Sequence, residues 1–246
     1  GPPPPRRILP HPRAPMVYNV DMISIGGDFC FSDVGCTNLG AASYWGFLEA
    51  CASQNHVRLF SSGRTAYANV WLNLKRTRPA FRKALVPSYL CYSMLSPLTR
   101  MGAEVHFYEV GPDLTVDADD LQRVAASVGT APADLLVLVC NYFGFPETPE
   151  VLEATANLRA AGTAVVYDAT HSAMCMPASA GTMGRPGGPA PFDVTVMSLR
   201  KSLPVVDGAV VLWMDGTAPA IEPGTWKHEA VYSARAQAML LKAAHI

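Results

Sequence analysis

The sequence has little charge and no excess of either sign. Only 16% of its 246 residues are Asp, Glu, Lys or Arg, and the formal net charge is -1 at pH 7. A marked positive charge is what draws proteins to nucleic acid or to anionic membrane surfaces. No apolar run approaches the roughly 18–20 residues that a membrane-spanning helix needs. The N-terminus also lacks the basic, apolar and small-residue order of a signal peptide. We therefore expect neither nucleic acid nor a membrane among the partners.

Cysteine pairs with the spacing of a metal site are absent as well. Structural zinc sites commonly take thiolates two to four residues apart, and no CxxC pair occurs here, so we predict no metal. Buried, reduced thiols are the simplest interpretation, and they favour a cytoplasmic protein. The six cysteines are Cys30, Cys36, Cys51, Cys91, Cys140 and Cys175.

Proline is concentrated at the start of the chain. Residues 1–15 hold seven prolines, and proline fixes φ and lacks an amide donor, so we expect an extended or disordered arm. Residues 16–55 are expected to form a segment of loops and helix. The aromatic cluster of Tyr44, Trp45 and Phe47 within it could pack inside the monomer or at a subunit interface.

From residue 56 onward, short apolar runs alternate with helix-like segments. The runs are rich in Val or Leu and nearly uninterrupted, which is typical of strands buried on both faces. The alternation predicts an α/β domain over 56–228, with a mostly parallel seven-stranded sheet covered by helices. Strands are predicted at 56–60, 84–88, 104–110, 134–141, 164–169, 193–199 and 209–214. Helices are predicted at 65–76, where Thr65 would be the cap, and at 92–101, 117–127 and 149–161, with loops at 170–192 and 215–228 and a last helix at 229–246.

Three of the predicted strands end in polar residues. The turn Ser61-Ser62-Gly63-Arg64-Thr65 opens a helix and could offer backbone N–H groups to a phosphate, although any strand-to-helix turn favours such residues. Asp168 lies at the end of the predicted strand 164–169. Burying a carboxylate there is costly unless a cation pairs with it, and the alternative is that Asp168 only caps the strand end. Lys201 follows the predicted strand 193–199. Desolvation in a pocket could lower the pKa of its amine and make it a nucleophile, and the alternative is that Lys201 lies on the solvated surface.

These three features are more informative together than apart. Ligands of such sheets bind beyond the carboxyl ends of the strands, so the three are expected at one site. Pyridoxal 5'-phosphate (PLP) needs a cradle for its phosphate, an anion beside its pyridinium nitrogen and an amine for its aldehyde. The sequence therefore predicts PLP as the cofactor.

The stretch from about 56 to 214 resembles the large domain of fold-type-I PLP-dependent aminotransferases, most closely the DegT/DnrJ-like group that includes nucleotide-sugar aminotransferases. The matching pieces occur in family order and at family-like spacing. They are Ser62-Gly63-Arg64-Thr65-Ala66, Val86-Pro87-Ser88-Tyr89, Met101-Gly102-Ala103-Glu104-Val105, Asn141-Tyr142-Phe143-Gly144, Tyr167-Asp168-Ala169-Thr170-His171, Ser198-Leu199-Arg200-Lys201 and Leu203-Pro204-Val205-Val206-Asp207-Gly208.

The resemblance implies a role for each polar residue of the site. Lys201 would bond covalently to the cofactor and move the substrate's α-proton, and Asp168 would pair with the ring nitrogen. His171 would lie near the ring or its phenolic oxygen, and Asn141 would hydrogen-bond that oxygen. Gly63, Arg64, Thr65 and Ser198 would hold the phosphate, and the residue stacked on the ring would come from 89–92, at Cys91 with Tyr92 and Tyr89 beside it.

The same resemblance implies a PLP-dependent aminotransferase that acts on a sugar-like or other biosynthetic ketone, with small amines and ketones as substrates. Another PLP reaction, such as a lyase or elimination, is an alternative, and so is a non-catalytic relative that serves as a partner subunit. Lys201 argues against the dehydratases of this group that carry His in its place. Relatives continue into a C-terminal small domain, of which 229–246 would be the remaining helix. A homodimer with shared active sites is also implied.

Overall fold

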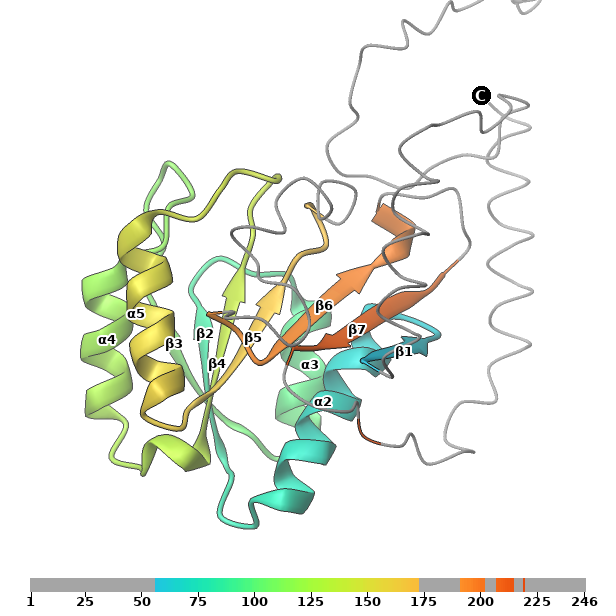
Figure 1. Cartoon of the computed structure of the whole chain (residues 1–246), viewed down its shortest axis with the longest axis horizontal. Coiled ribbons are helices and arrows are strands. Elements are labelled where there is room, and N and C mark those ends of the chain that lie inside the picture. Colours follow the sequence, from blue (N-terminus) through green and yellow to red (C-terminus); the bar gives the residue numbers. More distant parts are fainter. Residues whose placement is uncertain (1–55, 173–190, 202–206, 215–218, 220–246) are drawn as a thin grey trace, which may run out of the picture.

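The computed structural model describes residues 56–172, 191–201, 207–214 and 219 (Figure 1). Several predictions lie outside these residues: the arm at 1–15, the segment at 16–55 with its aromatic cluster, most of the two long loops, and the helix at 229–246. Among the residues that the structure describes, every helix is too short or too polar to cross a membrane.

The described strands form one seven-stranded sheet in the order β1-β7-β6-β5-β4-β2-β3. The pairs from β6 to β3 are parallel, whereas β7 is antiparallel to both β1 and β6. The prediction of a mostly parallel, helix-covered α/β sheet is confirmed. The strands are β1 (Val57–Phe60), β2 (Lys83–Pro87), β3 (Glu104–Tyr108), β4 (Leu135–Cys140), β5 (Ala164–Asp168), β6 (Val194–Ser198) and β7 (Ala209–Trp213).

Helices cover both faces of this sheet. Because parallel strands are joined by right-handed crossovers, the reversal of strand order after β3 puts α3 on the face opposite to α4 and α5. Figure 1 shows α4 and α5 packed together on one side, and α2 and α3 together on the other. The helices are α2 (Gly63–Thr77), α3 (Tyr92–Arg100), α4 (Ala118–Ser127) and α5 (Pro149–Ala160), with short 3-10 turns η1 (Pro132–Asp134) and η3 (Leu199–Lys201).

The first of these helices begins two residues earlier than predicted. Its N-cap is Ser62 rather than the predicted Thr65, because Ser62 has extended backbone and its Oγ accepts a hydrogen bond from the Thr65 N–H at 3.3 Å. Thr65 completes the capping box, since its Oγ1 accepts from the Ser62 N–H at 3.1 Å. The box closes the turn between β1 and α2 and so fixes where the helix axis starts.

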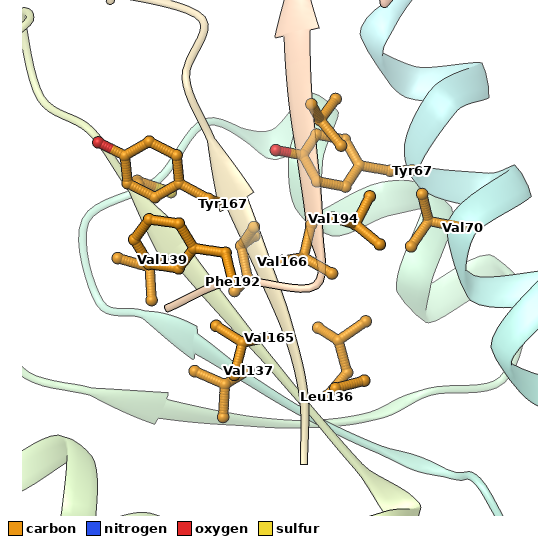
Figure 2. Close-up of a cluster of buried hydrophobic side chains, with 14 of the residues drawn as sticks. Tyr67, Val70, Leu136, Val137, Val139, Val165, Val166, Tyr167, Phe192 and Val194 are labelled. Carbon is orange, nitrogen blue, oxygen red and sulfur yellow. The ribbon is translucent and has the colours of Figure 1, made fainter. Parts of the chain in front are cut away.

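The core lies between the central strands and the helices. All six residues of β4 are buried, and β5 is buried over its full length. Figure 2 shows Val137 and Val139 beside Val165, Val166 and Val194. The rings of Tyr167 and Phe192 stack with centroids 4.2 Å apart. Burial of each Val or Leu side chain stabilises the fold by about 1.5–3 kcal/mol, so the strand ends that carry polar side chains stand on a rigid base.

Candidate active site

A cavity of about 350 Å³ opens at the carboxyl edge of the sheet, within the size range of small-molecule sites. It lies beyond the ends of β4, β5 and β6 and beside the first turns of α2 and α3. Eight of the ten site residues expected from the sequence line it. They are Gly63, Arg64, Cys91, Asn141, Asp168, His171, Ser198 and Lys201.

The start of α2 lies against the end of β6. A Cβ placed on Gly63 would lie 3.6 Å from the Cβ of Ser198, so the helix terminus and the Ser198 side chain are adjacent. The capping box uses the N–H groups of Ser62 and Thr65, and those of Gly63 and Arg64 have no acceptor among the described residues. Free donors at the positive end of a helix, next to a hydroxyl, suit a phosphate group.

Two expected residues stay outside the cavity lining. The Thr65 hydroxyl is turned back to the Ser62 carbonyl oxygen, to which it donates at 2.7 Å. Tyr92 is the first residue of α3 and its side chain is 71% exposed. Cys91, the N-cap of α3, does line the cavity, and its Sγ lies 2.8 Å from the Ser93 Oγ.

Asp168 ends β5 and is 7% exposed. Its Oδ1 accepts a hydrogen bond from the Thr170 N–H at 2.8 Å, and its Oδ2 accepts one from the Tyr67 hydroxyl. These two donors offset much of the cost of burying the carboxylate, for which the sequence suggested either a cationic partner or a cap at the strand end. Sequence reasoning missed Tyr67. The available signal was a tyrosine on the apolar face of α2, since a buried tyrosine hydroxyl needs a partner.

Lys201 and His171 face the same cavity. No hydrogen bond or ion pair joins the Lys201 ammonium to any described residue. Burial lowers the pKa of His171; the negative charge of Asp168 opposes this shift and the positive charge of Lys201 adds to it. The His171 Nδ1 accepts from the Phe143 N–H at 3.2 Å, so the neutral ring carries its proton on Nε2. The His171 and Phe143 rings stack with centroids 5.2 Å apart.

Asn141 presents an acceptor that nothing uses. Its Nδ2 donates to the Phe145 carbonyl oxygen at 2.6 Å and to the Glu147 Oε1 at 3.1 Å. Its buried Oδ1 has no hydrogen-bond partner among the described residues. Glu147 also accepts from the Tyr167 hydroxyl at 3.1 Å. The sequence offered no signal for Glu147, because a glutamate in a Pro-rich loop reads as solvated.

No group of three or more His, Cys, Asp or Glu side chains stands ready to hold a metal ion in the described part of the chain. The cavity lining brings together the Lys201 amine, the hydrogen-bonded Asp168 carboxylate, the His171 imidazole and the start of α2, with Arg64, Arg200 and Asp207 also present. An amine beside guanidinium groups and a helix N-terminus suits an anionic carbonyl compound.

Comparison with solved structures relates this geometry to known enzymes. No protein-family model matches the sequence, and no curated protein matches it. Many solved structures match, and three that share the fold illustrate the range. A sphingosine-1-phosphate lyase from Burkholderia pseudomallei is 16% identical with a TM-score of 0.51, covering 82% of this chain and 52% of its own. A sugar aminotransferase from Micromonospora echinospora is 18% identical with a TM-score of 0.50, covering 79% and 55%. A GDP-4-keto-6-deoxymannose-3-dehydratase with bound GDP-perosamine is 14% identical with a TM-score of 0.51, covering 78% and 51%.

The chain thus has the α/β fold of fold-type-I PLP-dependent enzymes, as the sequence resemblance implied. It spans about half the length of the three matched structures. Those structures are a lyase, an aminotransferase and a dehydratase, so the shared fold does not select a reaction.

Proposed function

We propose that this chain is a PLP-dependent enzyme in which Lys201 is the amine that bonds to the cofactor. One observation carries the proposal. An amine, a buried carboxylate and a helix N-terminus, from three separate parts of the sheet, line one cavity. Each of the three is common alone, but their convergence is what PLP requires.

The residues around the cavity fit the cofactor group by group. The free N–H groups of Gly63 and Arg64, with Ser198 beside them, suit the phosphate. Asp168 suits the ring nitrogen, and the unused Asn141 Oδ1 suits the ring hydroxyl. When bound, PLP supplies an electron sink for the carbanion formed on the substrate.

The chain's own residues supply the rest of the chemistry. Lys201 takes and returns a proton at the substrate carbon. Tyr67 and Thr170 hold the Asp168 carboxylate in a fixed, buried position by hydrogen bonds. His171 stays neutral near pH 7 because burial lowers its pKa, so it can donate from Nε2 without adding positive charge beside Lys201.

We infer that the reaction is transfer of an amino group to a sugar-like or other biosynthetic ketone. The sequence motifs of the DegT/DnrJ-like group support this, as does the fold shared with a sugar aminotransferase. Lys201 argues against the dehydratases of the group that carry His at its place. A lyase reaction is the second candidate, favoured by the fold shared with a sphingosine-1-phosphate lyase.

Borohydride reduction of the PLP-loaded chain, followed by peptide mapping, tests the proposal. The label should fall on Lys201 and should be lost in Lys201→Arg. It should persist in Lys75→Arg, a matched control on α2 outside the cavity lining. A label on Lys75 or Lys83 would contradict the assignment. Adding candidate amino donors should then convert the cofactor to its amine form. Release of a cleaved product instead would favour a lyase, and an inert chain would favour a non-catalytic partner subunit.

We further propose that residues 56–228 form the cofactor-binding domain and that the chain is a homodimer with shared sites. Exposed aromatic side chains near the site support the dimer, since aromatics are enriched in interface centres. Tyr89 lines the cavity, and Tyr92 and Phe145 are exposed on the chain segments next to lining residues. Light scattering at micromolar concentration should give twice the chain mass. A monomer that still bound PLP tightly would contradict shared sites.

A further inference from the structure

Tyr67 lies directly behind the carboxylate of the site. It is 4% exposed, belongs to α2 and lines the cavity. Figure 2 shows its side chain extending from the helix with the hydroxyl pointing away from it. That hydroxyl donates to the Asp168 Oδ2. Burial first, and the Asp168 charge second, raise the pKa of Tyr67 well above its ordinary value, so Tyr67 stays a neutral donor.

The helix that carries Tyr67 also carries the proposed phosphate site. Gly63 and Tyr67 are four residues apart, so they lie on the same face of α2, one turn from each other. Gly63 lies against Ser198 at the end of β6, while Tyr67 reaches Asp168 at the end of β5. One helix face therefore contacts both ends of the proposed ligand position.

The Asp168 carboxylate can accept further hydrogen bonds. A carboxylate offers about four lone-pair sites, and Tyr67 and the Thr170 N–H use one on each oxygen. A ring N–H from the cofactor would then compete with Tyr67 for the same negative charge. Each hydrogen bond to a carboxylate makes it a weaker attractor for the next proton.

We propose that Tyr67 is a positioning residue that draws off part of the Asp168 charge and so sets how firmly the carboxylate holds a proton on the cofactor's ring nitrogen. This inference rests on the proposed function. Tyr67 acts through its hydrogen bond to Asp168. Its role is to set the protonation of the cofactor's ring nitrogen rather than to move a proton at the substrate carbon.

The ring nitrogen of ¹⁵N-labelled PLP reports this effect directly by NMR. In Tyr67→Phe, its signal should move toward the fully protonated value, and the pH at which that proton is lost should rise by about one unit, because one charged hydrogen bond is removed. A fluorinated tyrosine at position 67 keeps the packing and is a stronger donor, so it should move the signal the other way. The fluorinated variant also provides a test of the inference if Tyr67→Phe fails to fold.

Tyr108→Phe is the matched control. Tyr108 is fully buried, and its hydroxyl donates to the Leu138 carbonyl oxygen at 2.8 Å, away from the cavity. That variant should lose stability and leave the nitrogen signal unchanged. The inference would be overturned if the nitrogen signal moved in neither position-67 variant, or if it moved equally in Tyr108→Phe. If Lys201 still carried the cofactor in those experiments, the proposed function would stand and only this inference would fail. A wild-type chain that takes up no PLP would overturn the proposed function as well.

Discussion

Replacing Glu147 by Gln should make the protein more stable at neutral pH. Burial raises the pKa of Glu147, and hydrogen bonds from Asn141 and Tyr167 oppose that shift without cancelling it. A glutamine oxygen at this position can still accept both hydrogen bonds. The substitution therefore removes the cost of a buried negative charge and keeps the local contacts.

The sign follows from the raised pKa. The folded protein binds a proton on Glu147 more firmly than the unfolded chain does. The stability that this proton contributes is therefore fully present below the ordinary pKa of 4.5. That contribution is lost as the pH rises through the raised pKa of Glu147 in the folded protein. Across that window, wild-type stability should fall relative to Glu147→Gln by up to about 1.4 kcal/mol for each pH unit. Below pH 4 the two proteins should be alike.

Urea unfolding at a series of pH values measures this difference. Glu150→Gln is the control, because it lies three residues further along but has the opposite shift. Its own backbone N–H and the Thr148 hydroxyl lower the pKa of Glu150. It should be less stable than wild type at neutral pH and equal to it at low pH. If Glu147→Gln were less stable than wild type at pH 7, the charged form would be the favoured one and the reasoning would be wrong.

Two further predictions concern the frame of the site. Ser62→Ala removes the hydroxyl half of the capping box and should lower the free energy of unfolding by about 1 kcal/mol in urea titrations; an unchanged value would mean that water replaces the cap. Leu138→Ala, in the fully buried centre of β4, should cost about 2–5 kcal/mol, whereas Leu72→Ala on the exposed face of α2 should cost less than about 0.5 kcal/mol. Equal losses in the two leucine variants would contradict the burial assigned to β4.

The strands could be found from the sequence because the central ones are buried on both faces and read as unbroken Val and Leu runs. Their directions could not be read the same way, since a buried strand looks identical when reversed. The length of the connection between two strands indicates whether they can be parallel. Only ten residues, 199–208, separate β6 from β7, and a parallel crossover needs a dozen or more. The antiparallel place of β7 follows from this short connection.

The residues that line the cavity were predictable where a polar residue follows an apolar strand, as at Asp168 and Lys201. Thr65 and Tyr67 show the limit of that approach. Both lie on α2, and a helical residue turns toward a site or away from it according to where the helix begins. With the cap at Ser62, the Thr65 hydroxyl is used in the turn, and the Tyr67 hydroxyl reaches Asp168.

The pairing of β1 with β7 also sets the order in which the molecule can assemble. Phe60 lies opposite Ala209, which the ribosome adds 149 residues later. The strands from β2 to β5 can associate while the chain is still growing, but the edge that carries β1 has no partner until β7 has been made. Long-range pairing of this kind closes a large loop and is slow. We therefore expect the helix terminus after β1 to reach its place beside Ser198 only after β6 and β7 have been made, so that the proposed phosphate site is completed late in folding.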